Sequence, residues 1–239
     1  MHSLVRHLLA LFTLLLGALL VGLPVWAQAP APTDKTEVLW LGQSCFRITT
    51  PGGKVIVIDP WLVNNPKTPA AYKRLEALGK VDVILVTHGH ADHFADAPAL
   101  ARLHNVPVRA EHSSVVNWRN PATDKDEVHF GGEPLGYIIE LENGFRVYHA
   151  GDTAVFGDMK YIGERYRPDL ALVPIGGNFT MDPADAAYAV RELIRPKVVI
   201  PMHFGTNPLA KGTAKEFVDA MGAGPVKVII AEPGQALLF

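Results

Sequence analysis

The chain has 239 residues, of which 49% are hydrophobic and 19% charged, so it can bury a full core as one domain and does not have the composition of a disordered chain. Its formal net charge of −2 at pH 7 gives no long-range positive field, which argues against nucleic acid or an anionic membrane surface as a partner. A single cysteine, Cys45, excludes a disulfide within the chain.

The N-terminal residues have the pattern of an export signal. Arg6 lies in a short polar start, and an almost unbroken apolar run follows from Leu8 to Val25. Ala27 supplies the small residue expected before a cleavage site. We therefore predict a signal peptide at 1–27, a polar spacer at 28–36 and export to the periplasm, with no membrane contact after cleavage. The alternative is an uncleaved membrane anchor, because an apolar run of roughly 18–20 residues can span a bilayer.

Short apolar, β-rich runs bounded by glycine and proline recur through the rest of the chain and predict strands. In chain order they are Val38–Leu41, Phe46–Thr49, Val55–Ile58, Val81–Thr87, Tyr137–Leu141, Arg146–His149, Leu170–Pro174, Val198–Pro201 and Val226–Ala231.

Helical spacing of apolar residues lies between several of these runs, in Ala95–Leu103, Met159–Tyr166, Pro183–Ile194 and Thr213–Met221. Asp182 is placed to cap the third helix, whose first turn contains Pro183. The early strands follow one another like hairpins, whereas the later strands alternate with helices. This order predicts an α/β (α+β) fold in which helices cover the outer faces of the sheets.

A dense group of metal-binding residue types follows one of the predicted strands. The apolar run Val81–Val86 reads as a buried strand, and Thr87-His88-Gly89-His90-Ala91-Asp92-His93 leaves its C-terminal end, where ligand sites of α/β folds usually lie. Burying these side chains without partners would cost several kcal/mol each. A metal removes that cost, so the run predicts a metal site; the alternative is a solvated loop that happens to be rich in histidine.

The run matches the His-x-His-x-Asp-His motif of the metallo-β-lactamase fold, and two later segments strengthen the resemblance. Gly151-Asp152-Thr153 follows a predicted strand and resembles the family's bridging-aspartate motif. Pro201-Met202-His203-Phe204 resembles its last histidine motif. The resemblance covers about residues 37 to 239, and it implies one domain over 37–239 folded as a four-layer αββα sandwich.

Further segments resemble one branch of this family, the metal-dependent hydrolases related to ascorbate-phosphate lactonase. These segments are Trp40-Leu41-Gly42, Ile58-Asp59-Pro60, Glu111-His112-Ser113-Ser114, Tyr148-His149-Ala150-Gly151-Asp152-Thr153 and Pro174-Ile175-Gly176-Gly177-Asn178-Phe179-Thr180-Met181.

Carried onto this chain, the resemblance implies a two-metal site, with zinc expected and manganese as the other candidate. Its ligands would be His88, His90 and His112 for the first metal, Asp92, His93 and His203 for the second, and Asp152 between the two metals.

This ligand set suits hydrolysis. Neutral imidazoles with few carboxylates keep each cation strongly Lewis acidic, and the pKa of a water held between two cations falls from about 15.7 towards 7. The hydroxide would attack a carbonyl carbon or a phosphorus atom while the cations stabilise the developing oxyanion. The sequence thus predicts a hydrolase that cleaves an ester, lactone, phosphoester or amide of a small molecule, with Asp92 and Asp152 as catalytic residues. The substrate itself and the oligomeric state are not predicted.

Several assignments have simpler alternatives. Asp152 could cap a turn, His203 could be an ordinary strand-end residue, and His112 could be a surface-loop histidine beside two serines. His149 would point away from Asp152 along an extended strand, so we interpret it as a core residue or as support for a ligand. Asp59 is expected to orient a loop or a ligand histidine rather than to bind metal.

A few residues are candidates to position the substrate or to line its pocket. Gln43 stands where the related hydrolases generally carry histidine, and an amide cannot donate a proton at neutral pH. Candidates to line a pocket, with ordinary packing as the alternative, are Phe179, Met181, Trp118 and Phe204.

The interval between His93 and His112 is shorter than in the family, which normally places a helix and several further strands there. Here it has room for one helix, Ala95–Leu103, and one short strand, Val106–Arg109. We therefore expect a sandwich shortened between residues 104 and 111, either as a naturally compact variant or through loss of a segment between Val106 and Arg109. A misplaced His112 would leave a metal-binding protein with little catalysis. A di-iron redox protein is the other alternative, although that variant usually has glutamate at the place of His90.

Overall fold

The computed structural model describes residues 34–110, 115–120, 125–130 and 134–239. One mixed sheet, which we call the first sheet, contains strands from both ends of this range in the order β13-β1-β2-β3-β4-β5. Strands β13, β1, β2 and β3 are each antiparallel to their neighbours in this order, whereas β4 pairs in parallel with β3 and with β5. The strands are β1 (Glu37–Trp40), β2 (Phe46–Thr49), β3 (Val55–Ile58), β4 (Val83–Val86), β5 (Val108–Ala110) and β13 (Ala236–Leu238).

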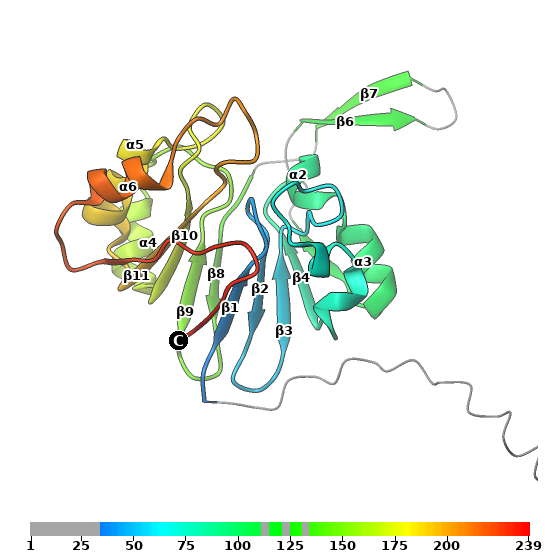
Figure 1. Cartoon of the computed structure of the whole chain (residues 1–239), viewed down its shortest axis with the longest axis horizontal. Helices are drawn as coiled ribbons and strands as arrows, with labels where there is room; N and C mark the ends of the chain where they lie inside the picture. Colours follow the sequence, from blue (N-terminus) through cyan, green and yellow to red (C-terminus); the bar gives the residue numbers. More distant parts are fainter. Residues whose placement is uncertain (1–33, 111–114, 121–124, 131–133) are drawn as a thin grey trace, which may run out of the picture.

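The second sheet has the order β12-β11-β10-β9-β8. Strands β9 to β12 are parallel and β8 is antiparallel to β9. The strands are β8 (Tyr137–Glu140), β9 (Arg146–His149), β10 (Leu170–Pro174), β11 (Val198–Met202) and β12 (Lys227–Val228). A separate hairpin of β6 (Val115–Asn120) and β7 (Lys125–Phe130) pairs with neither large sheet and extends away from the body of the molecule (Figure 1).

Helices cover the outer face of each sheet (Figure 1). The short 3₁₀ helices η1 (Ala70–Tyr72) and η2 (Leu75–Leu78) and the α-helices α2 (Ala91–Phe94) and α3 (Ala97–His104) belong to the first half of the chain. On the second sheet lie α4 (Met159–Tyr166), α5 (Pro183–Tyr188), its π-helical continuation η3 (Ala189–Ile194) and α6 (Ala214–Met221). The predicted mixed α/β fold is confirmed, and the order of layers is helices, sheet, sheet, helices.

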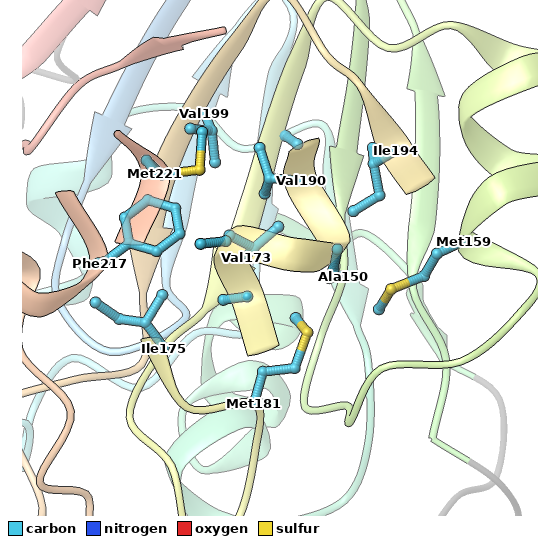
Figure 2. Close-up of a cluster of buried hydrophobic side chains, with 14 of the residues drawn as sticks. Ala150, Met159, Val173, Ile175, Met181, Val190, Ile194, Val199, Phe217 and Met221 are labelled. Carbon is cyan, nitrogen blue, oxygen red and sulfur yellow. The ribbon is translucent and has the colours of Figure 1, made fainter. Parts of the chain in front are cut away.

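The core lies in three layers between these elements. Buried residues of both sheets, such as Phe46 and Ile58 from the first and Leu172 and Ile200 from the second, pack together in the middle of the molecule. Figure 2 shows the layer between the second sheet and its helices, where Phe217 of α6 lies among valines, isoleucines and methionines. The third layer joins the first sheet to α3.

The capping residue predicted for the third helix is confirmed. Asp182 accepts a hydrogen bond from the backbone N–H of Asp185 at 2.8 Å, and Pro183 begins α5. The carboxylate satisfies one of the N–H groups that a helix start leaves without a partner. Within the described part of the chain, no helix combines the length and the hydropathy needed to cross a membrane. The predicted signal peptide and residues 28–33 of the spacer lie outside the described residues, so these assignments stay predictions.

Candidate metal centre

Three parallel strand ends supply the polar side chains of the site. β4 ends at Val86 and leads into Thr87 and the histidine-rich run, β9 ends just before Asp152, and β11 ends at Met202, directly before His203. Parallel strands place their carboxyl ends at the same edge of a sheet. The end of β4 in the first sheet and the ends of β9 and β11 in the second meet at one edge of the sandwich, where their residues come together.

Part of the histidine-rich run is helical. His90 has extended backbone and precedes α2, which carries Asp92 and His93. One helical turn, which the sequence analysis did not predict, places these two side chains beside the strand end. His93 is fully buried, His88 is 2% exposed, and His90 is exposed on the rim of the site.

The predicted ligands fall into two groups that share His93. His88, His93 and Asp152 form one group, and Asp92, His93 and His203 form the other; in each group the ligand atoms lie within 4.8 Å of one another. The distance from His93 Nε2 is 3.3 Å to Asp152 Oδ1 and 3.6 Å to Asp92 Oδ2. His203 Nε2 lies 3.1 Å from Asp152 Oδ2 and 3.4 Å from Asp92 Oδ2. Asp152 thus lies between the two groups.

Two further predicted ligands are His90 and His112. His90 belongs to neither group, but its Nδ1 lies 2.9 Å from Nε2 of His88. His112 lies outside the described residues, so its assignment stays a prediction.

Asp59 fixes the orientation of the buried histidine, as expected from the sequence. One carboxylate oxygen accepts from the backbone N–H of Thr87 at 2.7 Å, and the other lies 2.7 Å from both Thr87 Oγ1 and His93 Nδ1. Asp59 is fully buried and accepts the Nδ1 proton, so the other ring nitrogen of His93, Nε2, faces the carboxylates and would bind a cation once its own proton is displaced. The Thr87 hydroxyl, which donates to Asp59, accepts from His88 Nδ1 at 3.1 Å in the same way.

The electrostatics keep the two carboxylates ionised. Burial alone would raise the pKa of Asp152 and of Asp92, but the positive charge of His93 and contacts with His203 outweigh it and lower both pKa values. Burial works against the charged form of His203, and the neighbouring carboxylates nevertheless raise its pKa to about 9. For His88, burial and then the charge of His93 lower the pKa to about 4.

This set of donors fits a metal. Within the two groups, four buried atoms have no hydrogen-bond partner: His93 Nε2, Asp152 Oδ1 and both ring nitrogens of His203. Buried polar atoms are rarely left without partners, and a bound cation would supply one. Imidazole nitrogens with carboxylate oxygens are the donors that zinc and related cations prefer.

Three of the seven non-glycine residues with positive φ in the described structure lie at this site. Gln43, Asp59 and His203 have φ values of 53°, 48° and 56°, in the left-handed region that residues with a side chain seldom adopt. Each such residue costs on the order of 1–3 kcal/mol and persists only where the surroundings hold it. We call the two groups of predicted ligands the metal groups. His203 belongs to one of them, and Gln43 and Asp59 each contact a residue of a metal group.

A cavity of about 610 Å³ opens onto the groups, which is a usual size for a small-molecule site. Its polar and apolar walls come from several loops: Gln43, Trp61, His88, His90, Asp92, Pro134, Asp152, Phe179, His203, Thr206, Asn207 and Pro208.

Of the predicted pocket residues, Phe179 lines this cavity and is 52% exposed. Met181 is buried in the core, and Phe204 stacks on Trp40 with ring centroids 5.5 Å apart, so neither lines the cavity. The side chain of Trp118 is outside the described part of the structure. No local pattern indicated Trp61 or Thr206 as site residues, because only the folded loops bring them to the cavity.

His149 is a core residue that also joins the two halves of the molecule. It is fully buried, its Nε2 lies 2.9 Å from the Ser44 carbonyl oxygen, and its Nδ1 accepts from the backbone N–H of Gly151 at 3.2 Å. The first contact reaches the loop after β1 and the second fixes the residue before Asp152, so His149 supports the site without facing it.

Proteins that are similar to this chain over most of its length are named metal-dependent hydrolases. A UPF0173 metal-dependent hydrolase of Polaromonas sp. (strain JS666) is 57% identical over 90% of this chain and 93% of its own length. Another from Cupriavidus taiwanensis is 52% identical over 98% of this chain and 100% of its own length. That alignment runs over 286 positions, so this relative has several tens of residues without a counterpart in the present chain.

Solved structures and a family model agree with these relatives. A metallo hydrolase of the hyperthermophilic archaeon Ignicoccus hospitalis superposes with a TM-score of 0.72 and 31% identity, covering 86% of this chain and 98% of its own. The finer resemblance to hydrolases related to ascorbate-phosphate lactonase stays a prediction. The family model of the β-lactamase superfamily domain matches residues 37–203, so this chain belongs to the β-lactamase superfamily and is one of its metal-dependent hydrolases.

Proposed function

We propose that the chain hydrolyses an ester, lactone, phosphoester or amide of a small molecule with two metal ions, zinc being the expected metal. The observation that carries this proposal is the fully buried Nε2 of His93, which has no hydrogen-bond partner and is shared by both groups of metal-binding residues. A pair of bound cations would supply a hydroxide nucleophile near neutral pH and stabilise the oxyanion that forms.

The chain's own residues prepare this reaction. Asp59 and Thr87 orient His93 and His88, so that both imidazoles turn Nε2 inwards. Asp152 contacts members of both groups and would hold the two cations together. Asp92 lines the cavity, its side chain is 32% exposed, and its lowered pKa keeps it ionised, so it can accept a hydrogen bond from the attacking water and orient it.

The shape of the cavity supports a small-molecule substrate. Trp61, Phe179, Pro134 and Pro208 give it apolar walls beside the metal groups. Such walls can bind the apolar part of a substrate while the metal groups act on its polar bond.

The test combines metal analysis with a substrate panel. Purified protein should contain close to two metal ions per chain by plasma mass spectrometry, lose hydrolysis of the active panel member with a chelator, and regain it with zinc or manganese. The panel contains lactones, phosphodiesters, esters and β-lactams. Asp152→Asn should lose both metal and activity, whereas His104→Gln, outside the groups, should keep both. Full activity of metal-free protein, or two tightly held ions in Asp152→Asn, would overturn the proposal.

We also propose that residues 1–27 direct export and are removed. Periplasmic protein should then begin at Gln28 when its N-terminus is sequenced. Recovery of the intact N-terminus in the membrane fraction would favour the anchor instead.

A further inference from the structure

Gln43 connects two metal-group residues that come from distant parts of the chain. It lies in the loop between β1 and β2, is 2% exposed and lines the cavity. Its side-chain Nε2 donates to Asp92 Oδ2 at 2.9 Å. Its backbone carbonyl oxygen accepts from the N–H of His203 at 3.1 Å.

Other contacts fix Gln43 itself. The indole Nε1 of Trp40 donates to the same backbone carbonyl at 3.0 Å. At the other end of the side chain, Oε1 accepts from the hydroxyl of Thr206. An amide has a donor end and an acceptor end, so the Thr206 contact determines which end is turned towards Asp92. With Oε1 occupied, the amide must present its N–H group to the carboxylate.

From these contacts we infer that Gln43 is a positioning residue for one of the two metal ions, the one held by Asp92, His93 and His203, and that Thr206 sets its orientation. The inference rests on the proposed two-metal function. The amide hydrogen bond holds the Asp92 carboxylate in one orientation, and the backbone contact holds His203. Because the amide is neutral, it restrains Asp92 without adding a positive charge that would repel the cation.

The other group depends on different supports. His88 and His93 are oriented by Thr87 and Asp59, and no hydrogen bond in the described residues joins Gln43 to His88, His93 or Asp152. Loss of the Gln43 side chain should therefore weaken one ion selectively. Partners of metal ligands typically contribute about 10–100-fold to metal affinity, which sets the size of the expected change.

The experiment titrates the full-length metal-free protein with Zn²⁺ by calorimetry and resolves the two binding steps. Gln43→Met keeps the length of the side chain and removes both polar ends. It should weaken one step by about 10–100-fold and leave the other unchanged. Thr206→Val, which frees the amide to rotate, should weaken the same step by less.

Thr68→Val is the matched control, because the Thr68 hydroxyl donates to the Leu41 carbonyl at 2.8 Å in the same region without touching Gln43. It should bind both ions like the unaltered protein. Thermal unfolding of each metal-free variant checks that the fold is retained.

The outcomes separate this inference from the proposed function. If the unaltered protein binds two ions but folded Gln43→Met binds both with unchanged affinity, or loses affinity equally in both steps, the positioning role is wrong and the two-metal function stands. If the unaltered protein binds fewer than two ions, the proposed function fails first and the inference fails with it.

Discussion

Asp59 offers the sharpest test of how the site is built. In Asp59→Asn, the oxygen that accepts from Thr87 N–H can be kept, but an NH₂ group then faces His93 Nδ1, which lies 2.7 Å from the native oxygen. Two donors cannot face each other. His93 would have to move its proton to Nε2, the atom that faces both metal groups, and would then no longer bind a cation there.

The size of the effect follows from the bond that is lost. A hydrogen bond to a charged group contributes about 1.5–3 kcal/mol, and about 1.4 kcal/mol corresponds to a tenfold change in an equilibrium constant. Asp59→Asn should therefore weaken zinc binding by about 10–100-fold, although Asp59 itself is not a ligand. Because His93 is shared, both ions should be affected, unlike the selective loss expected at Gln43.

Competition with a chromophoric chelator measures this change. The matched control is Asp96→Asn, since the Asp96 carboxylate accepts from the backbone N–H groups of Leu62 and Val63 at 2.6 and 3.0 Å and touches no metal-group residue in the described structure. It should lose stability but keep its zinc affinity. The reasoning is refuted if folded Asp59→Asn binds zinc as tightly as the unaltered protein, or if Asp96→Asn loses as much affinity.

Three further predictions concern protons, backbone and core. Burial would lower the pKa of His203, but the neighbouring carboxylates raise it from 6.5 to about 9, so zinc must displace a proton at neutral pH. Because His93 is charged as well, zinc affinity should rise at least about tenfold per pH unit up to about pH 9. Calorimetry in buffers of different ionisation enthalpy should detect the released protons, and a flat profile would contradict this. Gly151→Ala should cost about 1–3 kcal/mol and weaken zinc binding, because φ is 65° and the new Cβ would lie 2.7 Å from the Leu135 carbonyl oxygen. Gly144→Ala, at φ 79° with open space around it, isolates the backbone penalty in the same urea titration and should leave zinc affinity unchanged. Phe217→Ala, fully buried under the second sheet, should cost about 3–5 kcal/mol in urea unfolding without changing zinc affinity of the folded protein.

Strands with a strong local pattern could be predicted from the sequence. β2, β3, β9 and β10 have the bounds that were expected, because each contains buried apolar residues in a short run. The edge strand β13 was missed. It pairs with β1 across almost the whole described chain and is mostly exposed, so its three residues carry no periodic signal.

The site could be predicted only in part, for a similar reason. The histidine-rich run and the residues after β9 and β11 carry their chemistry in the local sequence, and the structure brings together His88, Asp92, His93, Asp152 and His203. The contacts that orient them are non-local. Gln43 reaches Asp92 over 49 residues and Thr206 over 163, distances over which the spacing of residues indicates nothing.

Between His93 and His112 the described residues form α3 and β5, close to the one helix and one short strand expected there. β5 lies at an edge of the first sheet. The hairpin of β6 and β7, which follows this interval, was not predicted, and its strands pair only with each other.

The metal groups combine residues from the two halves of the molecule, so bound cations would also link these halves. Asp92 and His93 belong to the half built on the first sheet, and Asp152 and His203 to the half built on the second. A bound ion would act as a non-covalent cross-link between the halves, contributing free energy according to its concentration over its dissociation constant. A substitution that weakens the packing between the halves, even far from the cavity, would then lower the affinity for the metal.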